Sequence, residues 1–219
     1  MYLYDILLNN RILLKLIFTI IIGFICFIIV LRTHKLFKLS EHQGIRYFRN
    51  AFFFYGLAFV LRYFIEIISP SVTKLVFEFF LIMAGFFLLY SLMWKKFETE
   101  RRGKNSSLFN SRIFLFYTLT IILVCLDYIW QGYCFMFGSQ IVLFTYAGII
   151  SYINYKKNNG RGFTGLYFIV MLLNLIAWAA NFIVSIFFGW YKPVVIGIYV
   201  LNAIIFLIFL YGVLSLTRR

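Results

Sequence analysis

The chain has 219 residues, of which 63% are hydrophobic and 13% are charged. Soluble domains are about 45–50% apolar, so this composition excludes an ordinary soluble protein. The net charge is +14, and a strongly positive net charge is also typical of nucleic-acid-binding proteins. Here, however, the basic residues fall between long apolar stretches, and we therefore expect no nucleic acid among the partners.

Seven apolar stretches account for nearly the whole chain. About 20 mostly apolar residues in a helix cross a hydrocarbon core roughly 30 Å thick. The sequence therefore predicts an all-α, polytopic membrane protein, a bundle of seven transmembrane helices that forms a single domain over residues 1–219. In chain order, the predicted spans are 12–31, 50–69, 72–94, 113–130, 140–155, 166–189 and 194–216.

The basic residues alternate between the connections of these spans. Sixteen of the 21 Lys and Arg residues fall in segments that share one side of the membrane if every span crosses: Arg32, Lys35, Lys38, Arg46, Arg49, Lys95, Lys96, Arg101, Arg102, Lys104, Arg112, Lys156, Lys157, Arg161, Arg218 and Arg219. Cytoplasmic loops are enriched in Lys and Arg. We therefore predict a protein of the cell membrane with its N-terminus outside and its C-terminus inside, although Arg11 and Lys15 oppose this orientation.

A faint internal repeat relates the second span to the sixth. At an offset of 119 residues, four positions correspond: Tyr55 with Asn174, Phe59 with Trp178, Arg62 with Asn181, and Glu66 with Ser185. Such repeats can also arise by chance in an apolar sequence. A true duplication predicts a 3+1+3 plan, with three-helix units at 12–94 and 140–216 joined by a linker helix at 113–130.

This 3+1+3 plan resembles that of the sugar-transporter (SWEET) and PQ-loop proteins and, more distantly, that of microbial rhodopsins. The resemblance covers all seven spans and is architectural. It implies parallel repeats about an axis along the membrane normal. No functional residue is carried over, because the chain has no Pro-Gln pair, and its prolines, Pro70 and Pro193, lie between predicted spans. Residues 194–216 hold no lysine, which excludes a retinal Schiff base in the last span.

Polar residues within the spans are the candidate functional residues, because ionisable groups inside a membrane are costly and usually serve a function. Helical spacing places several of them on shared faces, such as Arg62 with Glu66, and Asn174 with Trp178 and Asn181. The candidate ligand-binding residues are Arg62, Glu66, Glu78, Asp127, Asn174, Trp178, Asn181 and Asn202. The alternative is that these groups merely join helices to one another.

No enzyme motif is present, so we expect no catalytic residue, and we expect neither a metal nor a cofactor. The expected partners are the bilayer and anionic lipids at the cytoplasmic face, where basic and apolar residues alternate over 33–49. A protein partner or a homo-oligomer in the membrane stays open.

Three functions are compatible with this sequence. The leading hypothesis is a multi-pass protein that binds a small solute at a polar centre in the outer half of the bundle, with transport of that solute through the centre as an extension of the hypothesis. The second is a receptor-like sensor that signals through its basic cytoplasmic loops. The third is a non-catalytic structural subunit of a membrane complex.

Overall fold

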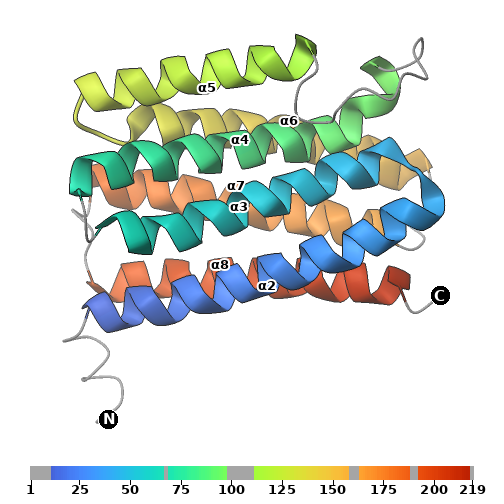
Figure 1. Cartoon of the computed structure of the whole chain (residues 1–219), viewed down its shortest axis with the longest axis horizontal. Coiled ribbons are helices and arrows are strands. Elements are labelled where there is room, and N and C mark those ends of the chain that lie inside the picture. The colour runs from blue at the N-terminus through green and yellow to red at the C-terminus, as the bar shows by residue number, and fades with distance from the viewer. Residues whose placement is uncertain (1–10, 67–68, 98–110, 158–162, 188–191, 218–219) are drawn as a thin grey trace.

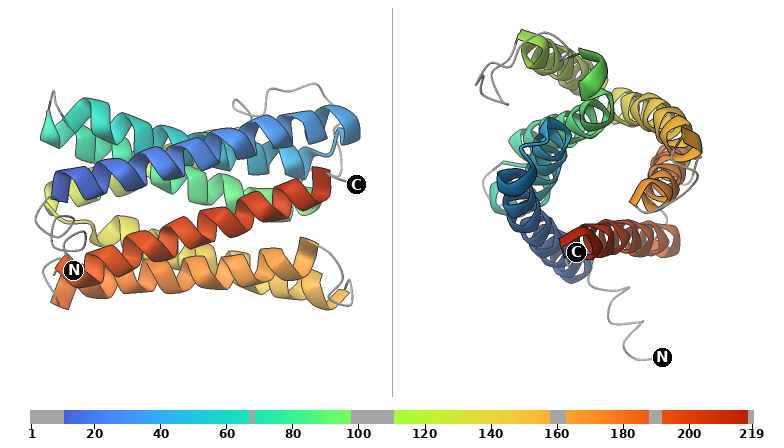
Figure 2. Two further views of the ribbon diagram at one scale, coloured as in Figure 1. Left: turned by 90° about the horizontal axis from the view of Figure 1, so that it is seen from below. Right: turned by 90° about the vertical axis from the view of Figure 1, so that its right-hand side faces the viewer.

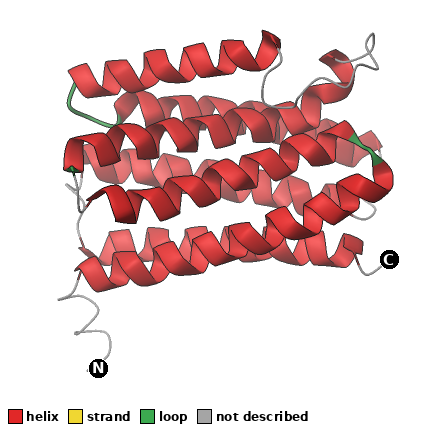
Figure 3. Ribbon diagram, viewed as in Figure 1, coloured by secondary structure: helices red, strands yellow, loops and turns green. Residues whose placement is uncertain are grey.

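The computed structural model describes residues 11–66, 69–97, 111–157, 163–187 and 192–217; at some helix ends, Glu66 included, only the backbone is described. All secondary structure in these ranges is helical (Figure 3). The described helices are α2 (Arg11–Ser40), α3 (Gln43–Glu66), α4 (Pro70–Phe97), α5 (Ser111–Ile129), α6 (Cys134–Lys157), α7 (Phe163–Phe187) and α8 (Lys192–Thr217) (Figure 1).

Five of these helices, α2, α4, α6, α7 and α8, are long and apolar enough to cross a bilayer. Helix α5 is apolar but shorter, and α3 carries Arg46, Arg49 and Arg62 among its apolar residues. The exposed side chains of the long helices include large apolar ones, such as Ile20, Phe24 and Phe27 of α2. Apolar exposure of this extent fits contact with lipid, and together these features indicate a multi-pass membrane protein.

Helix α2 is longer than the predicted first span. The segment 33–49, predicted to connect the first two spans, is instead the last part of α2 and the first turns of α3. A helix of 30 residues is about 45 Å long, so α2 exceeds the thickness of a hydrocarbon core. It ends where Glu41 adopts a left-handed conformation, with φ 49, and its N–H donates to the carbonyl of Phe37 at 2.8 Å.

The helices form a ring when the bundle is seen end-on (Figure 2, right). Around the ring, each helix contacts the next in the order α2, α3, α4, α6, α7 and α8, and α8 closes the ring against α2. Helix α5 lies outside the ring, where it packs against α4 and α6. Helix α3 therefore faces α7 across the ring.

We call the end of the bundle that holds the α2–α3 turn and Thr217 the basic end, because Lys35, Lys38 and Lys157 also lie there (Figure 1, right). The end that holds the α5–α6 turn is the opposite end. Near the basic end, the interior of the ring is filled by aromatic rings from α3, α7 and α8. This aromatic cluster consists of Phe48, Phe52, Tyr167, Phe206 and Phe209, all buried.

The aromatic cluster joins helices across the ring. Phe52 lies 4.9 Å from Phe209, and Phe48 lies 5.9 Å from Tyr167, measured between ring centroids. Such separations are typical of favourable edge-to-face and tilted ring pairs. The hydroxyl of Tyr167 also lies 3.3 Å from that of Ser91 on α4, which connects α7 to a helix that is not its neighbour in the ring. The interior is therefore closed in this half.

Candidate functional site

The polar face of α3 points into the ring. Residues spaced by three or four positions lie on one face of a helix, and Tyr55, Phe59 and Arg62 continue the face of Phe52. Since Phe52 contacts Phe209 of α8, this face is directed inward. The guanidinium of Arg62 lies 4.4 Å from the centroid of the Phe77 ring on α4, and the Arg62 side chain is partly exposed. This geometry is a cation–π contact.

The polar stripe predicted on α7 also points inward, because Asn174, Trp178 and Asn181 continue the face of Tyr167. Ile176 lies on the other side of the helix and is 56% exposed, whereas Asn174 is 7% exposed. Both asparagines donate a side-chain hydrogen bond to a carbonyl one turn earlier, Asn174 to Val170 at 2.9 Å and Asn181 to Ala177 at 2.8 Å.

Asn202 brings α8 to the same region. It continues the face of Phe206 and Phe209 toward the opposite end, and its side chain is partly exposed. Together with the residues of α3 and α7 it forms what we call the interior polar group: Arg62, Asn174, Trp178, Asn181 and Asn202. Apart from Asn174, its members are partly exposed, although they lie on the same helix faces as the buried aromatic cluster.

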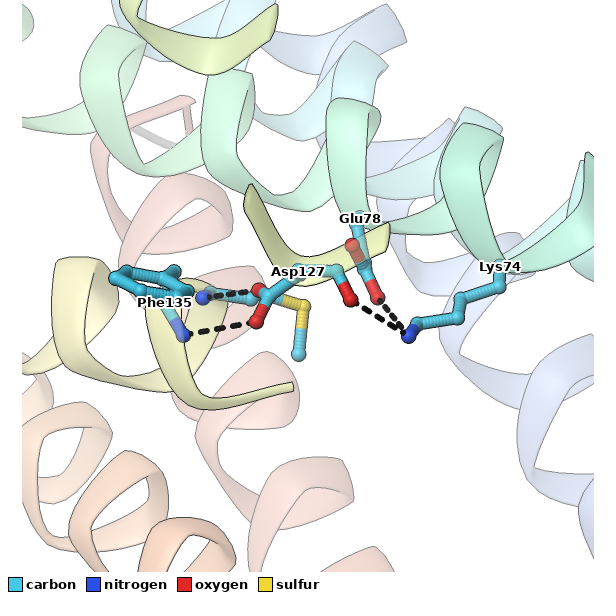
Figure 4. Close-up of polar contacts among 5 residues, drawn as sticks. Lys74, Glu78, Asp127 and Phe135 are labelled. Carbon is cyan, nitrogen blue, oxygen red and sulfur yellow. Dashed lines mark hydrogen bonds and ion pairs between the residues drawn. The ribbon is translucent and has the colours of Figure 1, made fainter. Parts of the chain in front are cut away.

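Glu78 and Asp127, which the sequence analysis grouped with these residues, lie elsewhere. They meet Lys74 where α4, α5 and α6 pack together, and we call Lys74, Glu78 and Asp127 the seam cluster (Figure 4). Glu66, the remaining candidate, ends α3 on the inward face, but its side chain is outside the described residues, and so is its pairing with Arg62.

Asp127 connects α5 to α6 and fixes the turn between them. Its two carboxylate oxygens accept hydrogen bonds from the backbone N–H groups of Phe135 at 2.9 Å and Met136 at 2.6 Å, in the first turn of α6 (Figure 4). A carboxylate at this position satisfies N–H groups that have no partner within the helix and interacts favourably with the helix dipole. The carboxylate of Asp127 is thus already engaged within the fold.

The backbone of Asp127 takes part in the same turn. Its carbonyl accepts from the N–H of Gly132 at 3.2 Å, while the N–H of Gln131, which has φ 52, donates to Tyr128 at 3.3 Å. This pair of bonds is a Schellman motif, which ends α5. The same carbonyl also accepts a bond from Lys74 Nζ at 3.3 Å.

Glu78 has a different environment. Its side chain is fully buried, and Lys74 Nζ lies 3.8 Å from Oε1. Within the described part of the chain, neither carboxylate oxygen has a hydrogen-bond partner. Native proteins rarely leave buried polar atoms in this state, and such atoms call for an explanation.

The structure adds two polar groups to the predicted candidates. Gln140 is fully buried; its Nε2 donates to the carbonyl of Leu81 at 3.2 Å, while its Oε1 has no partner among the described residues. Tyr55 is buried on the inward face of α3, and its hydroxyl has no hydrogen-bond partner there either. Gln140 was missed because it is the first residue of the predicted span 140–155, where a polar side chain is expected. In the structure it lies inside α6, which begins at Cys134.

The basic end carries a second charged surface. The guanidinium of Arg49 lies 2.8 Å from Nδ1 of His34, and Arg46 and Arg49 lie 5.9 Å and 5.8 Å from the centroid of the Phe37 ring. Burial, and then the positive charge of Arg46, lower the pKa of the Arg49 guanidinium. The α2–α3 hairpin therefore holds its cations in defined positions.

No group of three His, Cys, Asp or Glu side chains in the described ranges is arranged to hold a metal ion. Cys26 is buried, whereas Cys125 and Cys134 are exposed, and all three are free thiols. Within the ring, the described polar side chains include the guanidinium of Arg62 and the amides of Asn174, Asn181 and Asn202, beside aromatic surface.

No family model and no solved structure matches this chain. A segment of 51 residues, 23% of the chain, is 43% identical to an uncharacterised protein of Archaeoglobus fulgidus, of which the match covers 22%. The similarity is thus confined to about a quarter of either protein. The length and apolar composition of the described helices therefore indicate a helical, multi-pass membrane protein.

Proposed function

We propose that the protein binds a small polar solute at the interior polar group, which the solute reaches from the opposite end of the bundle. One observation carries this proposal. The inward faces of α3, α7 and α8 are buried and aromatic near the basic end, but polar and partly exposed toward the opposite end. A face that turns away from lipid and stays accessible to solvent is what a binding site within a membrane requires.

The proposed orientation places the basic end in the cytoplasm, in the cell membrane, with all seven helices crossing. Lys and Arg residues favour the cytoplasmic side, and the described residues Arg32, Lys35, Lys38 and Lys156 lie at that end. The interior polar group then opens to the outside. Anionic lipid headgroups are natural partners of the α2–α3 hairpin in this orientation.

The ring supports the 3+1+3 plan. Helices α3 and α7, which correspond in the proposed repeat, face each other across the ring, and α5, the proposed linker, lies outside it. Ala58 and Ala177, which correspond at the offset of 119 residues, are both buried. Proteins built from such repeats bind their substrates near the repeat interface, which is where α3 and α7 present their polar faces.

The residues suggest what the solute offers. The guanidinium of Arg62 suits a carboxylate or phosphate oxygen, and the amides of Asn181 and Asn202 suit hydrogen-bonding groups. Phe59, Phe77 and Trp178 provide aromatic surface around them; the ring of Trp178 is held 6.0 Å from that of Phe137. We therefore favour a small anionic or zwitterionic solute. Nothing in this set performs bond chemistry, so the proposed function is not enzymatic.

Cysteine labelling tests this proposal. In a background with Cys125 and Cys134 replaced by Ser, single cysteines at Asn181 and Asn202 should react with a small, membrane-impermeant thiol reagent added from outside. Matched cysteines at Ile176, on the opposite face of α7, and at Phe209, in the aromatic cluster, should react much more slowly, because thiolate formation requires water. Equal protection of all four positions would contradict the proposal and favour a structural subunit.

Transport and sensing differ in what the aromatic cluster must do. A transporter must also expose the interior from the cytoplasmic side, so a cysteine at Met171 should react with reagent trapped inside proteoliposomes. A receptor-like sensor keeps the cluster closed, and Met171 should stay protected from both sides. The packing of Phe52, Tyr167 and Phe209 favours this second function as the alternative.

A further inference from the structure

The carboxylate of Glu78 lies on the side of α4 that faces the seam with α5 and α6. It is fully buried, and its oxygens have no hydrogen-bond donor within reach in the described ranges. In the same seam, Oε1 of the buried Gln140 is also without a donor. Within the described part of the chain, these buried acceptor atoms thus have no hydrogen-bond partner, and a proton on Glu78 would supply the missing donor.

The charged and titratable groups around Glu78 favour a proton over a metal ion as the ligand of its carboxylate. From α4, Lys74 Nζ lies 3.8 Å from Oε1; from α5, Asp127 contributes a carboxylate whose oxygens are bound to the α6 backbone; and from the α5–α6 turn, the ring of Tyr133 lies 4.7 Å from Lys74 Nζ. The ammonium of Lys74 already occupies the position of a bound cation, and both carboxylate oxygens of Asp127 already accept a hydrogen bond from the backbone of α6. A metal ion beside this ammonium is therefore disfavoured by charge repulsion, whereas a proton neutralises Glu78 without displacing Lys74.

Lys74 does not depend on Glu78 for its partners. Its ammonium also donates to the carbonyl of Asp127 at 3.3 Å (Figure 4). It lies over the ring of Tyr133 as well, 4.7 Å from the centroid. When Glu78 is ionised, Lys74 balances its charge. When a proton adds to one carboxylate oxygen, that oxygen becomes a donor, Glu78 becomes neutral, and Lys74 stays bound to Asp127 and Tyr133. Lys74 therefore has partners in both protonation states of Glu78.

The helical turn that carries Lys74 and Glu78 also reaches the interior polar group. Phe77 lies in this turn, and its ring packs under the guanidinium of Arg62 at 4.4 Å. A rotation or shift of the turn that follows a change of charge at the seam must therefore move the surface that supports Arg62.

We propose that Glu78 is a proton-binding site whose occupancy is linked, through the turn 74–78, to the interior polar group. The proton comes from water at the opposite end and returns there, with no other reactant. The linkage rests on the proposed solute site, whereas the proton site itself does not. In a solute-binding membrane protein, such a site lets the proton concentration on the outer side control access to the solute site.

Infrared difference spectroscopy tests the proton site directly. The full-length protein in lipid nanodiscs is titrated with acid, and the C=O stretching band of a buried, protonated carboxylic acid is followed. We expect a band that grows as the pH falls and is lost in Glu78→Gln. Glu41→Gln, which alters an exposed carboxylate, should retain it. Superimposable spectra of the wild type and Glu78→Gln in this region would overturn the proposal.

The link is tested by repeating the Asn202 cysteine labelling at several pH values. Rates are divided by those of native Cys134, kept in a parallel sample, to remove the intrinsic pH dependence of a thiol. The corrected rate should change with pH and lose this change in Glu78→Gln. A corrected rate that depends on pH equally in both proteins would overturn the link. Absence of any labelling at position 202 would contradict the solute site, while the infrared band would still report on Glu78.

Discussion

The two ends of the bundle are stabilised by different interactions. Toward the basic end, aromatic rings of α3, α7 and α8 fill the space, and the most buried members of the aromatic cluster, Phe52 and Phe209, are 0% and 2% exposed. Toward the opposite end, the helices are joined by hydrogen bonds and charges, of which the bonds of Asp127 to the start of α6 are the most complete. The inward faces of α3, α7 and α8 run through both halves, so on these faces the difference lies in the side chains rather than in the backbone.

This difference indicates which half can change. Close packing tolerates little displacement, because each ring is in contact with several others. Polar contacts such as those of Lys74 have alternative partners and can be exchanged at lower cost. We therefore expect the closed half to account for most of the stability and the polar half to carry the function.

The largest effect is expected in the closed half. Phe52→Ala removes a ring that contacts Phe48, Tyr55, Phe206 and Phe209. Deleting a buried ring costs about 3–5 kcal/mol, which thermal unfolding in a mild detergent will detect. Phe53→Ala, on the adjacent and exposed side, is the control and should cost less than about 1 kcal/mol. Equal losses in the two variants would show that the ring interior is not the stabilising core.

The next effect tests the polar half. Asp127→Asn keeps the size of the side chain, but its amide nitrogen cannot accept a hydrogen bond from the backbone of α6. Losing a bond to a charged acceptor costs about 1.5–3 kcal/mol, and the amides of Phe135 and Met136 should exchange faster with deuterium. Tyr128→Phe, at the exposed neighbouring position, should leave both unchanged. Unaltered exchange in Asp127→Asn would mean that other contacts start α6.

A smaller effect tests how tightly the basic end is packed. A methyl group at Gly44 would lie 2.6 Å from Nε1 of Trp94, so the α2–α3 hairpin approaches α4 closely at this point. Gly44→Ala should therefore cost about 1–3 kcal/mol. Gly197→Ala meets no atom within 4 Å and should instead stabilise α8 by about 0.5–1 kcal/mol. If Gly44→Ala were also stabilising, the hairpin would be free to move away from Trp94.

The smallest effect concerns the turn that follows α5. Gln131 has φ 52, a conformation that is unfavourable for a residue with a side chain. Gln131→Gly should raise the free energy of unfolding by about 0.5–1 kcal/mol, measured as a rise in Tm. Gln131→Ala retains a Cβ and should not produce this gain. A loss of stability in Gln131→Gly would show that its side chain contributes more than the backbone strain costs.

The helices were predictable from the sequence, because apolar runs of this length have few alternatives. Their ends were less predictable. The basic residues between Arg32 and Arg49 indicated a connection, but α2 continues through Lys38, and Arg46 and Arg49 already belong to α3. A helix that leaves the membrane meets no barrier to polar side chains. Likewise, α6 begins at Cys134 because Asp127 caps it, which is a contact between two helices and leaves no local signal.

Periodicity alone determined which residues share a helix face: Tyr55 with Arg62, and Asn174 with Trp178 and Asn181. Helical geometry makes this a local property. The tertiary structure decided which faces meet. It directed the α3 and α7 stripes into one ring, but placed Glu78 and Asp127 in the seam with α5, because α5 packs outside the ring. The position of a helix around a bundle depends on contacts between distant segments, and those contacts only form once the whole chain has packed.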